Sequence, residues 1–227
     1  MKNMFSVRTK AMIWKDYRLI KASWKYYLFP AILMFTIVII RIFRYTADFT
    51  GNVFEWENFN IFSYALFNFS IVSILSLRFL YGIEKKNYVN DSIFASQTTN
   101  RELFQSRILS VFSFVMIYNA FFSSIVFIIV FLKFSVLPDL SLVLTIFAMV
   151  PVLALIIFQF FYIAIVYFPK IVYVDFLFTA FNFAILRFKE YLHVLNPFFV
   201  IPVGIVIAFI INYFMIRIPK STILKND

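Results

Sequence analysis

The sequence predicts an all-α protein that crosses a membrane several times, and three observations lead to this fold class. Of the 227 residues, 63% are hydrophobic and 34 are Phe. A soluble domain of this length cannot bury so much apolar surface, and the mean hydropathy is +0.90. The apolar residues also form runs of about the 20 residues that a membrane-spanning helix needs, and most Lys and Arg lie between the runs.

Six of these runs are long enough to be transmembrane helices within a single domain of residues 1–227. They cover residues 26–43, 59–81, 108–132, 141–168, 171–186 and 198–216. The fourth run is longer than one span and contains Pro151, which predicts a tilted or kinked helix. Residues 187–197, after the short fifth run, mix polar and aromatic side chains, which favours a short re-entrant segment at the external interface.

The distribution of Lys and Arg predicts the orientation of these spans. If both termini are cytoplasmic, sixteen basic residues lie on the cytoplasmic side and five lie outside: Arg41, Arg44, Lys133, Arg187 and Lys189. Basic residues concentrate on the cytoplasmic side of membrane proteins, so we expect both termini there. This topology explains the net charge of +10 without nucleic acid as a partner.

Residues 4–25 are predicted to form an amphipathic helix. At about 100° per residue, Lys and Arg, including Arg18, fill one arc, and the apolar arc holds Met12, Ile13, Tyr17, Leu19, Ile20 and Trp24. One interpretation is a helix that floats on anionic headgroups. The other is a connecting helix that braces a cytoplasmic partner. Asp16 falls on the apolar arc, where a carboxylate needs a partner.

The loop between the second and third runs, residues 82–107, carries a second polar pattern. Thr99 and Glu102 form a capping box that opens the helix of the third span. Residues 84–96 before it are predicted to form a short helix that presents Ile93 and Phe94. Two such helices would make a rigid projecting elbow with charges of both signs; the alternative is an ordinary solvated loop.

In the order of its parts, the chain resembles the ABC-2 type permeases of ATP-binding-cassette exporters. The resemblance runs from a basic amphipathic helix with the sequence Lys-Asp-Tyr-Arg (residues 15–18) through two spans to a loop with an early Glu84. An Arg-Glu-Leu (residues 101–103) and a basic Arg107 end this loop. Four further spans follow, with a Leu-Asn-Pro turn (residues 195–197) before the last.

The resemblance implies a permease that forms a dimer and has no ATPase site of its own. The loop would be a coupling helix that docks on a separate cytoplasmic ATPase, which would bind the ATP and Mg. The residues implied in coupling are Glu84, Ile93, Phe94, Arg101, Glu102 and Arg107, and those of the connecting helix are Asp16 and Arg18. Independently of the family, the sequence contains no G-x-x-x-x-G-K-[ST] phosphate loop, so we expect no ATP site and no other cofactor on this chain.

Polar residues inside the spans are candidates for a translocation path or a dimer interface, since they are costly in a membrane. Asp175, Thr179 and Asn182 share one face of the fifth run, and Arg78 lies at a similar depth in the second. Arg78 and Asp175 could pair, or Arg78 could extend to the headgroups. For the single amides Asn68, Asn119, Gln159 and Asn212, hydrogen bonds between helices are the simpler interpretation.

The function predicted from these observations is ATP-driven export of a hydrophobic or amphipathic molecule across a bacterial cell membrane. A peptide toxin or bacteriocin is the leading cargo class, and drugs or lipid-linked glycans are the alternatives. A non-transporting scaffold or sensor is a different class that stays open. An intramembrane enzyme or a metal site is disfavoured, because the chain has one His (His193), no Cys and no clustered pair of ligands.

Overall fold

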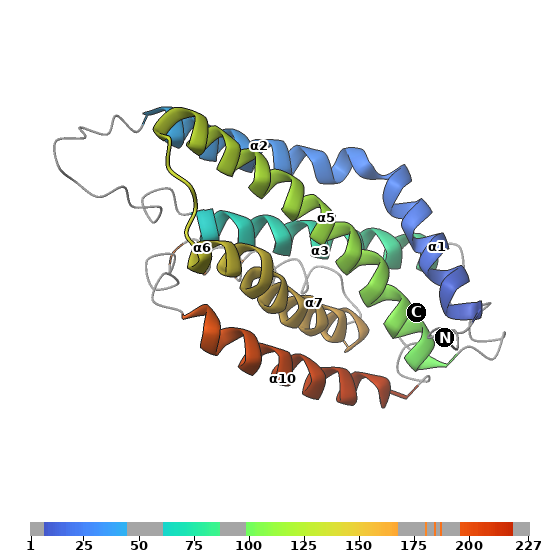
Figure 1. Cartoon of the computed structure of the whole chain (residues 1–227). Helices are drawn as coiled ribbons and strands as arrows, with labels where there is room; N and C mark the ends of the chain where they lie inside the picture. Colours follow the sequence, from blue (N-terminus) through green and yellow to red (C-terminus); the bar gives the residue numbers. More distant parts are fainter. Residues whose placement is uncertain are drawn as a thin grey trace.

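The structure is a computed structural model of the chain, and it describes residues 7–44, 61–86, 99–167 and 196–219, with the single positions 180, 184 and 187. The elements within these ranges are all helical, and no strand occurs among them (Figure 1). In chain order they are α1 (Val7–Ala22), α2 (Trp24–Arg44), α3 (Ile61–Lys86), α5 (Asn100–Phe134), α6 (Leu140–Leu144), the π-helical η2 (Thr145–Met149), α7 (Val150–Tyr167) and α10 (Pro197–Ile216).

Among the described residues, three helices are long and apolar enough to cross a membrane: α5, the continuous unit Leu140–Tyr167, and α10. This confirms an all-helical protein with membrane-spanning character. The first and second predicted spans fall on α2 and α3, which are helical as expected. The fifth predicted span, residues 171–186, and the re-entrant segment, residues 187–197, lie outside the described residues except for positions 180, 184, 187, 196 and 197.

Contacts between side chains fix the directions of neighbouring helices. On α5 and α7, Phe104 packs against Tyr162, with ring centroids 5.2 Å apart, and Phe127 packs against Phe147 of η2 at 6.1 Å. A later residue of one element therefore faces an earlier residue of the other. The third and fourth spans are antiparallel, as expected of helices joined by a short connection.

The helices α7 and α10 run parallel, which a short connection does not allow. A Cβ atom added to Gly204 would lie 2.5 Å from Cγ1 of Val152. Further along both helices, Gln159 Nε2 donates to Ala208 O at 3.2 Å. The residue numbers increase together in the two helices, so both run from the same end of the bundle to the other.

The helices α2 and α5 are also parallel, and their outer ends are joined by a lysine. The rings of Phe35 and Phe122 pack edge to face at 5.3 Å, and Lys133 Nζ donates to Ile42 O (2.7 Å) and Phe43 O (3.0 Å). These two carbonyls belong to the last turn of α2, where backbone acceptors lack intrahelical donors. The lysine at the end of α5 therefore caps α2.

The hydrophobic core surrounds α3, which contacts α1, α2, α5, η2 and α7 and is drawn between the outer helices in Figure 1. Its small hydroxyl side chains allow close packing, because Ser70 and Ser76 donate to the carbonyls of Leu66 and Val72 four residues earlier and leave no free polar group. Among the side chains of this helix that the structure describes, the buried apolar ones are Ala65, Leu66, Phe67, Phe69, Val72, Ile74, Leu77 and Leu80.

The fourth span departs from α geometry just before Pro151. Val150 N–H bonds to Thr145 O, five residues back, which makes a π-helical segment between α6 and α7. The sequence predicted an irregularity at this proline, and the structure places it in the preceding turn. A proline cannot donate a backbone hydrogen bond, so the turn before it is the one that must rearrange.

Both described ends of the chain lie at the same end of the bundle, together with the start of α5 (Figure 1). The side chain of Asn100 in the first turn of α5 donates to Ile218 O, just past the end of α10. We call this the inner end; it also contains α1. The predicted coupling loop begins and finishes at this end, because α3 ends and α5 begins there.

Candidate functional site

The first turn of α5 is closed by the predicted capping box. Glu102 N donates to Thr99 Oγ1 at 3.1 Å, and Thr99 N donates to Glu102 Oε2 at 3.1 Å. Both residues of the box therefore satisfy backbone donors that a helix start leaves free. The capped start confirms the sequence prediction and gives the C-terminal end of residues 82–107 a fixed direction.

The inner part of α5 extends beyond the thickness of a membrane. The helix has 35 residues and is therefore about 52 Å long, against about 30 Å for the hydrocarbon core. The apolar stretch begins only at Ile108, so the first two turns extend beyond this stretch at the inner end of the bundle. Arg107 stands at the boundary between the projecting and apolar parts.

One face of α1 packs on this boundary and on α3. The buried residues are Thr9, Met12, Asp16 and Ile20, at helical spacings of three and four. Of the predicted apolar arc, Met12 and Ile20 are buried, whereas Tyr17 is 46% exposed. The buried face is rotated toward the polar Thr9 and Asp16 because α5 supplies a cationic partner there. The face therefore packs against protein, which is not the arrangement of a helix that floats on headgroups.

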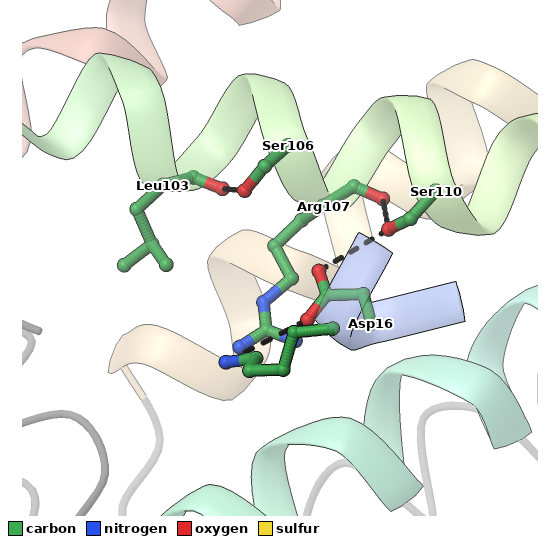
Figure 2. A network of polar contacts seen from close by, with 6 residues as sticks. Asp16, Leu103, Ser106, Arg107 and Ser110 are labelled. Atoms are coloured by element: carbon green, nitrogen blue, oxygen red, sulfur yellow. Dashed lines mark hydrogen bonds and ion pairs between the residues drawn. The ribbon is translucent and has the colours of Figure 1, made fainter. Parts of the chain in front are cut away.

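The partner of Asp16 is Arg107 (Figure 2). Arg107 Nη1 lies 3.0 Å from Asp16 Oδ1, and the two side chains are 5% and 2% exposed. The hydroxyl of Ser110, one turn further along α5, lies 3.2 Å from Asp16 Oδ2 and equally far from Arg107 O. Both carboxylate oxygens of Asp16 are therefore within hydrogen-bonding distance of α5.

Burial makes this pair sensitive to the loss of either member. Lys15 Nζ adds a second cation 3.7 Å from Asp16 Oδ1, from a side chain that is one-third exposed. Removing one member of a buried pair leaves the other charge uncompensated, at a typical cost of about 3–5 kcal/mol. The pair therefore fixes the position of α1 relative to α5, whatever its net contribution to the free energy of folding.

The opposite face of α1 is exposed and basic. Arg18 stacks over the ring of Trp14, with its guanidinium carbon 4.3 Å from the ring centroid, and takes no part in the Asp16 cluster. Lys21 continues this exposed face, and Lys25, which is also exposed, lies in the first turn of α2. Of the two residues predicted for the connecting helix, Asp16 faces the bundle and Arg18 faces away from it.

The other predicted coupling residues lie in three places. Arg101 is exposed in the first turn of α5, next to the capping residue Glu102. Glu84 belongs to the last turn of α3, which runs to Lys86, so the helix predicted over residues 84–96 does not begin at residue 84. Residues 87–96 of that prediction lie outside the described residues. The α3 helix simply continues past the apolar run. Ile93 and Phe94 lie outside the described residues.

The predicted path residues Asp175, Thr179 and Asn182 also lie outside the described residues. Arg78 is on α3, but its side chain is not among those described, so its pairing with Asp175 stays a prediction. Two of the single amides do form the expected bonds between helices: Asn119 Nδ2 donates to Ile146 O (3.3 Å) and Gln159 to Ala208 O.

Two contacts of this region were not predicted from the sequence. Ser110 carried no signal, because a serine in an apolar run usually bonds its own helix. The bond from Asn100 to Ile218 O joins segments 118 residues apart, and nothing local indicates it. The pairing of Asp16 with Arg107 had a partial signal, since Asp16 falls on the apolar arc of its helix and Arg107 directly precedes the third predicted span.

A comparison with protein-family models, with curated proteins and with solved structures finds no match to this chain. Within the part of the chain that the structure describes, no three His, Cys, Asp or Glu side chains lie close enough together to hold a metal ion. The function must therefore be argued from the arrangement of the helices and from the charged cluster at the inner end.

Proposed function

We propose that this protein is the membrane-spanning subunit of an ATP-driven exporter, of the ABC-2 permease type that its sequence resembles. The observation that carries the proposal is the buried pair of Asp16 and Arg107. It joins an N-terminal helix with an exposed basic face to the capped start of α5, which forms the C-terminal part of residues 82–107. Because α1 and the start of α5 are joined in this way, a movement of the loop can be transmitted to the helices that cross the membrane.

The parallel course of α7 and α10 supports the proposed six spans. If both helices cross the membrane, they cross it in the same direction, so the chain between them must cross back once. Residues 171–186 are the apolar run available for this crossing. With α2 and α3 as two further spans, both termini are on one side, and the excess of Lys and Arg assigns that side to the cytoplasm of a bacterium.

In this proposal the chain binds no nucleotide itself, and a separate cytoplasmic ATPase supplies the ATP and Mg chemistry. Glu84, Ile93, Phe94, Arg101 and Glu102 are the residues that would meet the ATPase. Arg107 has a different role from the docking role first assigned to it. It is buried against Asp16 and positions the projecting end of α5.

The cargo would be a hydrophobic or amphipathic molecule, with a peptide toxin or bacteriocin as the leading class. Two copies of the chain, or one copy with a close paralogue, would enclose the path. Arg78, Asp175, Thr179 and Asn182 are the polar residues proposed to line the path or the dimer interface.

The test is the hydrolysis rate of the ATPase that co-purifies with the chain, measured in liposomes with and without the chain. We expect the wild-type chain to raise the rate and Arg101→Glu to abolish this effect while still inserting in the membrane. The control is Arg217→Glu, which reverses an exposed charge at the same end but outside the loop; Arg217 stacks on Tyr213 at 4.1 Å.

An unchanged hydrolysis rate with the wild-type chain would contradict the proposal and favour a scaffold or sensor. Equal effects of the two charge reversals would also contradict it, because docking would then not depend on residues 82–107. Stimulation of the wild-type complex by amphipathic peptides, compared with lipophilic drugs, would identify the cargo class.

A further inference from the structure

The carbonyl oxygen of Ile146, in the fourth span, has no backbone donor in either the α-helical or the π-helical hydrogen-bond pattern. In an α-helix the donor would be Val150 N–H, but this group bonds to Thr145 O. In a π-helix the donor would be the N–H of residue 151, which is a proline and has none. Because Ile146 is fully buried, water cannot replace the missing donor.

Asn119 of α5 supplies the donor through its side chain. Its Nδ2 lies 3.3 Å from Ile146 O, and the residue is 5% exposed. The segment Thr145–Met149 also packs against α3 and α10, so α3, α5 and α10 all contact the fourth span at this segment. The hydrogen bond from Asn119 is thus made at a point where a change in one helix reaches several others.

We propose that Thr145–Met149 is a hinge in the fourth span and that Asn119 is its latch. The latched state is the one seen here, with Val150 bonded to Thr145 and Asn119 bonded to Ile146. In the released state Val150 N–H bonds to Ile146 O, the segment is a regular α-helix, and Asn119 gives up its acceptor. Ile146 O has a donor in each state, and in the released state Phe147 O, four residues before Pro151, is the carbonyl left without a backbone donor.

The change would re-aim the outer turn Leu140–Leu144 relative to α7, because a π-helical turn holds one more residue than an α-helical turn. The latched state prevails in this structure because release leaves the Asn119 amide buried without its acceptor. A movement of the outer half of the span would therefore require a new partner for Asn119. This inference is independent of the proposed function, since it concerns the backbone of one helix.

Distances across the hinge test the proposal by pulsed electron paramagnetic resonance. The chain has no Cys, so spin labels can be attached at Leu140→Cys and Phe160→Cys, two exposed positions on either side of the segment. We expect one narrow distance distribution in this background and a shifted or second peak when Asn119→Leu is added. Leucine fills a similar volume but cannot donate to Ile146 O.

Two further variants make the result specific. Gln159→Leu removes an equally buried amide whose acceptor, Ala208 O, keeps its own donor within the regular helix α10, so we expect no shift. Pro151→Ala restores the N–H that a π-helical pattern would give to Ile146 O, so the latch becomes unnecessary. In that background we expect Asn119→Leu to leave the distance unchanged.

An unchanged distance in Asn119→Leu overturns the proposal. A shift of the same size in Gln159→Leu overturns it as well, because the effect would then be a general loss of packing. A shift that persists with Pro151→Ala shows that Ile146 O is not the atom that matters. If Asn119→Leu does not fold, recovery of folded protein by Pro151→Ala supports the latch, and failure to recover it counts against the latch.

Discussion

The inner end of the bundle and its middle are held together by different chemistry. At the inner end a charged pair, Asp16 with Arg107, fixes α1 to α5. Twelve residues further along α5, or about 18 Å deeper, the neutral amide of Asn119 joins α5 to the fourth span. Gln159 makes the corresponding neutral bond to α10.

The difference follows from the cost of placing charge in a membrane. A charged side chain near the surface can exchange water for a protein partner, whereas a charge at the centre of the bilayer is far more costly than an amide. A hydrogen bond from a side-chain amide to a neighbouring helix contributes little to stability, typically about 0.6 to 2 kcal/mol. We therefore expect the inner end to depend on charge pairing and the middle to depend on the fit of the side chains.

The largest expected effect comes from breaking the charged pair. Asp16→Ala removes the carboxylate that lies 3.0 Å from the buried Arg107 guanidinium, and breaking a buried pair in this way should cost about 3–5 kcal/mol. For a chain of this size the thermal midpoint of the purified protein should fall by roughly 6 °C or more. Replacing both residues, as in Asp16→Leu with Arg107→Met, should be less harmful than the sum of the single changes.

The control for this experiment is Arg18→Ala, which removes an exposed basic residue from the same helix. Its stacking on Trp14 is worth about 0.5–1 kcal/mol at an exposed site, so its midpoint should change little. If the losses from Asp16→Ala and Arg107→Ala add up in the double variant, the two side chains do not act as a pair. Charge pairing would then not be what holds the inner end of the bundle together.

A smaller effect is expected where the middle of the bundle depends on fit. Gly204→Ala places a Cβ 2.5 Å from Cγ1 of Val152, a stiff branched side chain that cannot easily turn away. We expect a loss of about 1–3 kcal/mol, measured as the thermal midpoint. Adding Val152→Ala should restore part of it by making room. No loss, or a loss unaffected by Val152→Ala, would contradict close packing of α7 on α10.

The sequence predicted what depends on local pattern. The capping box of Thr99 and Glu102 is a matter of spacing within one turn, and the structure has it as expected. The membrane character follows from composition, and the irregularity of the fourth span follows from Pro151. Asp16 was expected to need a partner because an apolar arc offers a carboxylate no water.

The sequence did not predict which partner a residue finds across the fold. Arg107 was assigned to docking because it closes a charged loop, but its side chain turns toward α1, which is 91 residues away in the sequence. The rotation of the buried face of α1 away from Tyr17 has the same origin. A helical arc drawn from hydrophobicity alone cannot include the attraction of a cation on a neighbouring helix.

The smallest expected effect comes from removing the neutral helix cap at the inner end while leaving the charged pair in place. Thr99→Ala removes the side-chain acceptor of Glu102 N–H, and loss of such a cap typically costs about 1 kcal/mol. Because this cost concerns one turn only, amide exchange at residues 102 and 103 should become roughly fivefold faster. The pair of Asp16 and Arg107, more than one turn further along α5, should hold the rest of the helix unchanged.

The control is Asn196→Ala, which removes the corresponding cap from Phe198 N–H at the outer start of α10 and should affect exchange only there. Faster exchange that spreads from Thr99→Ala to Arg107 and beyond would show that the cap, rather than the charged pair, holds the projecting end of α5.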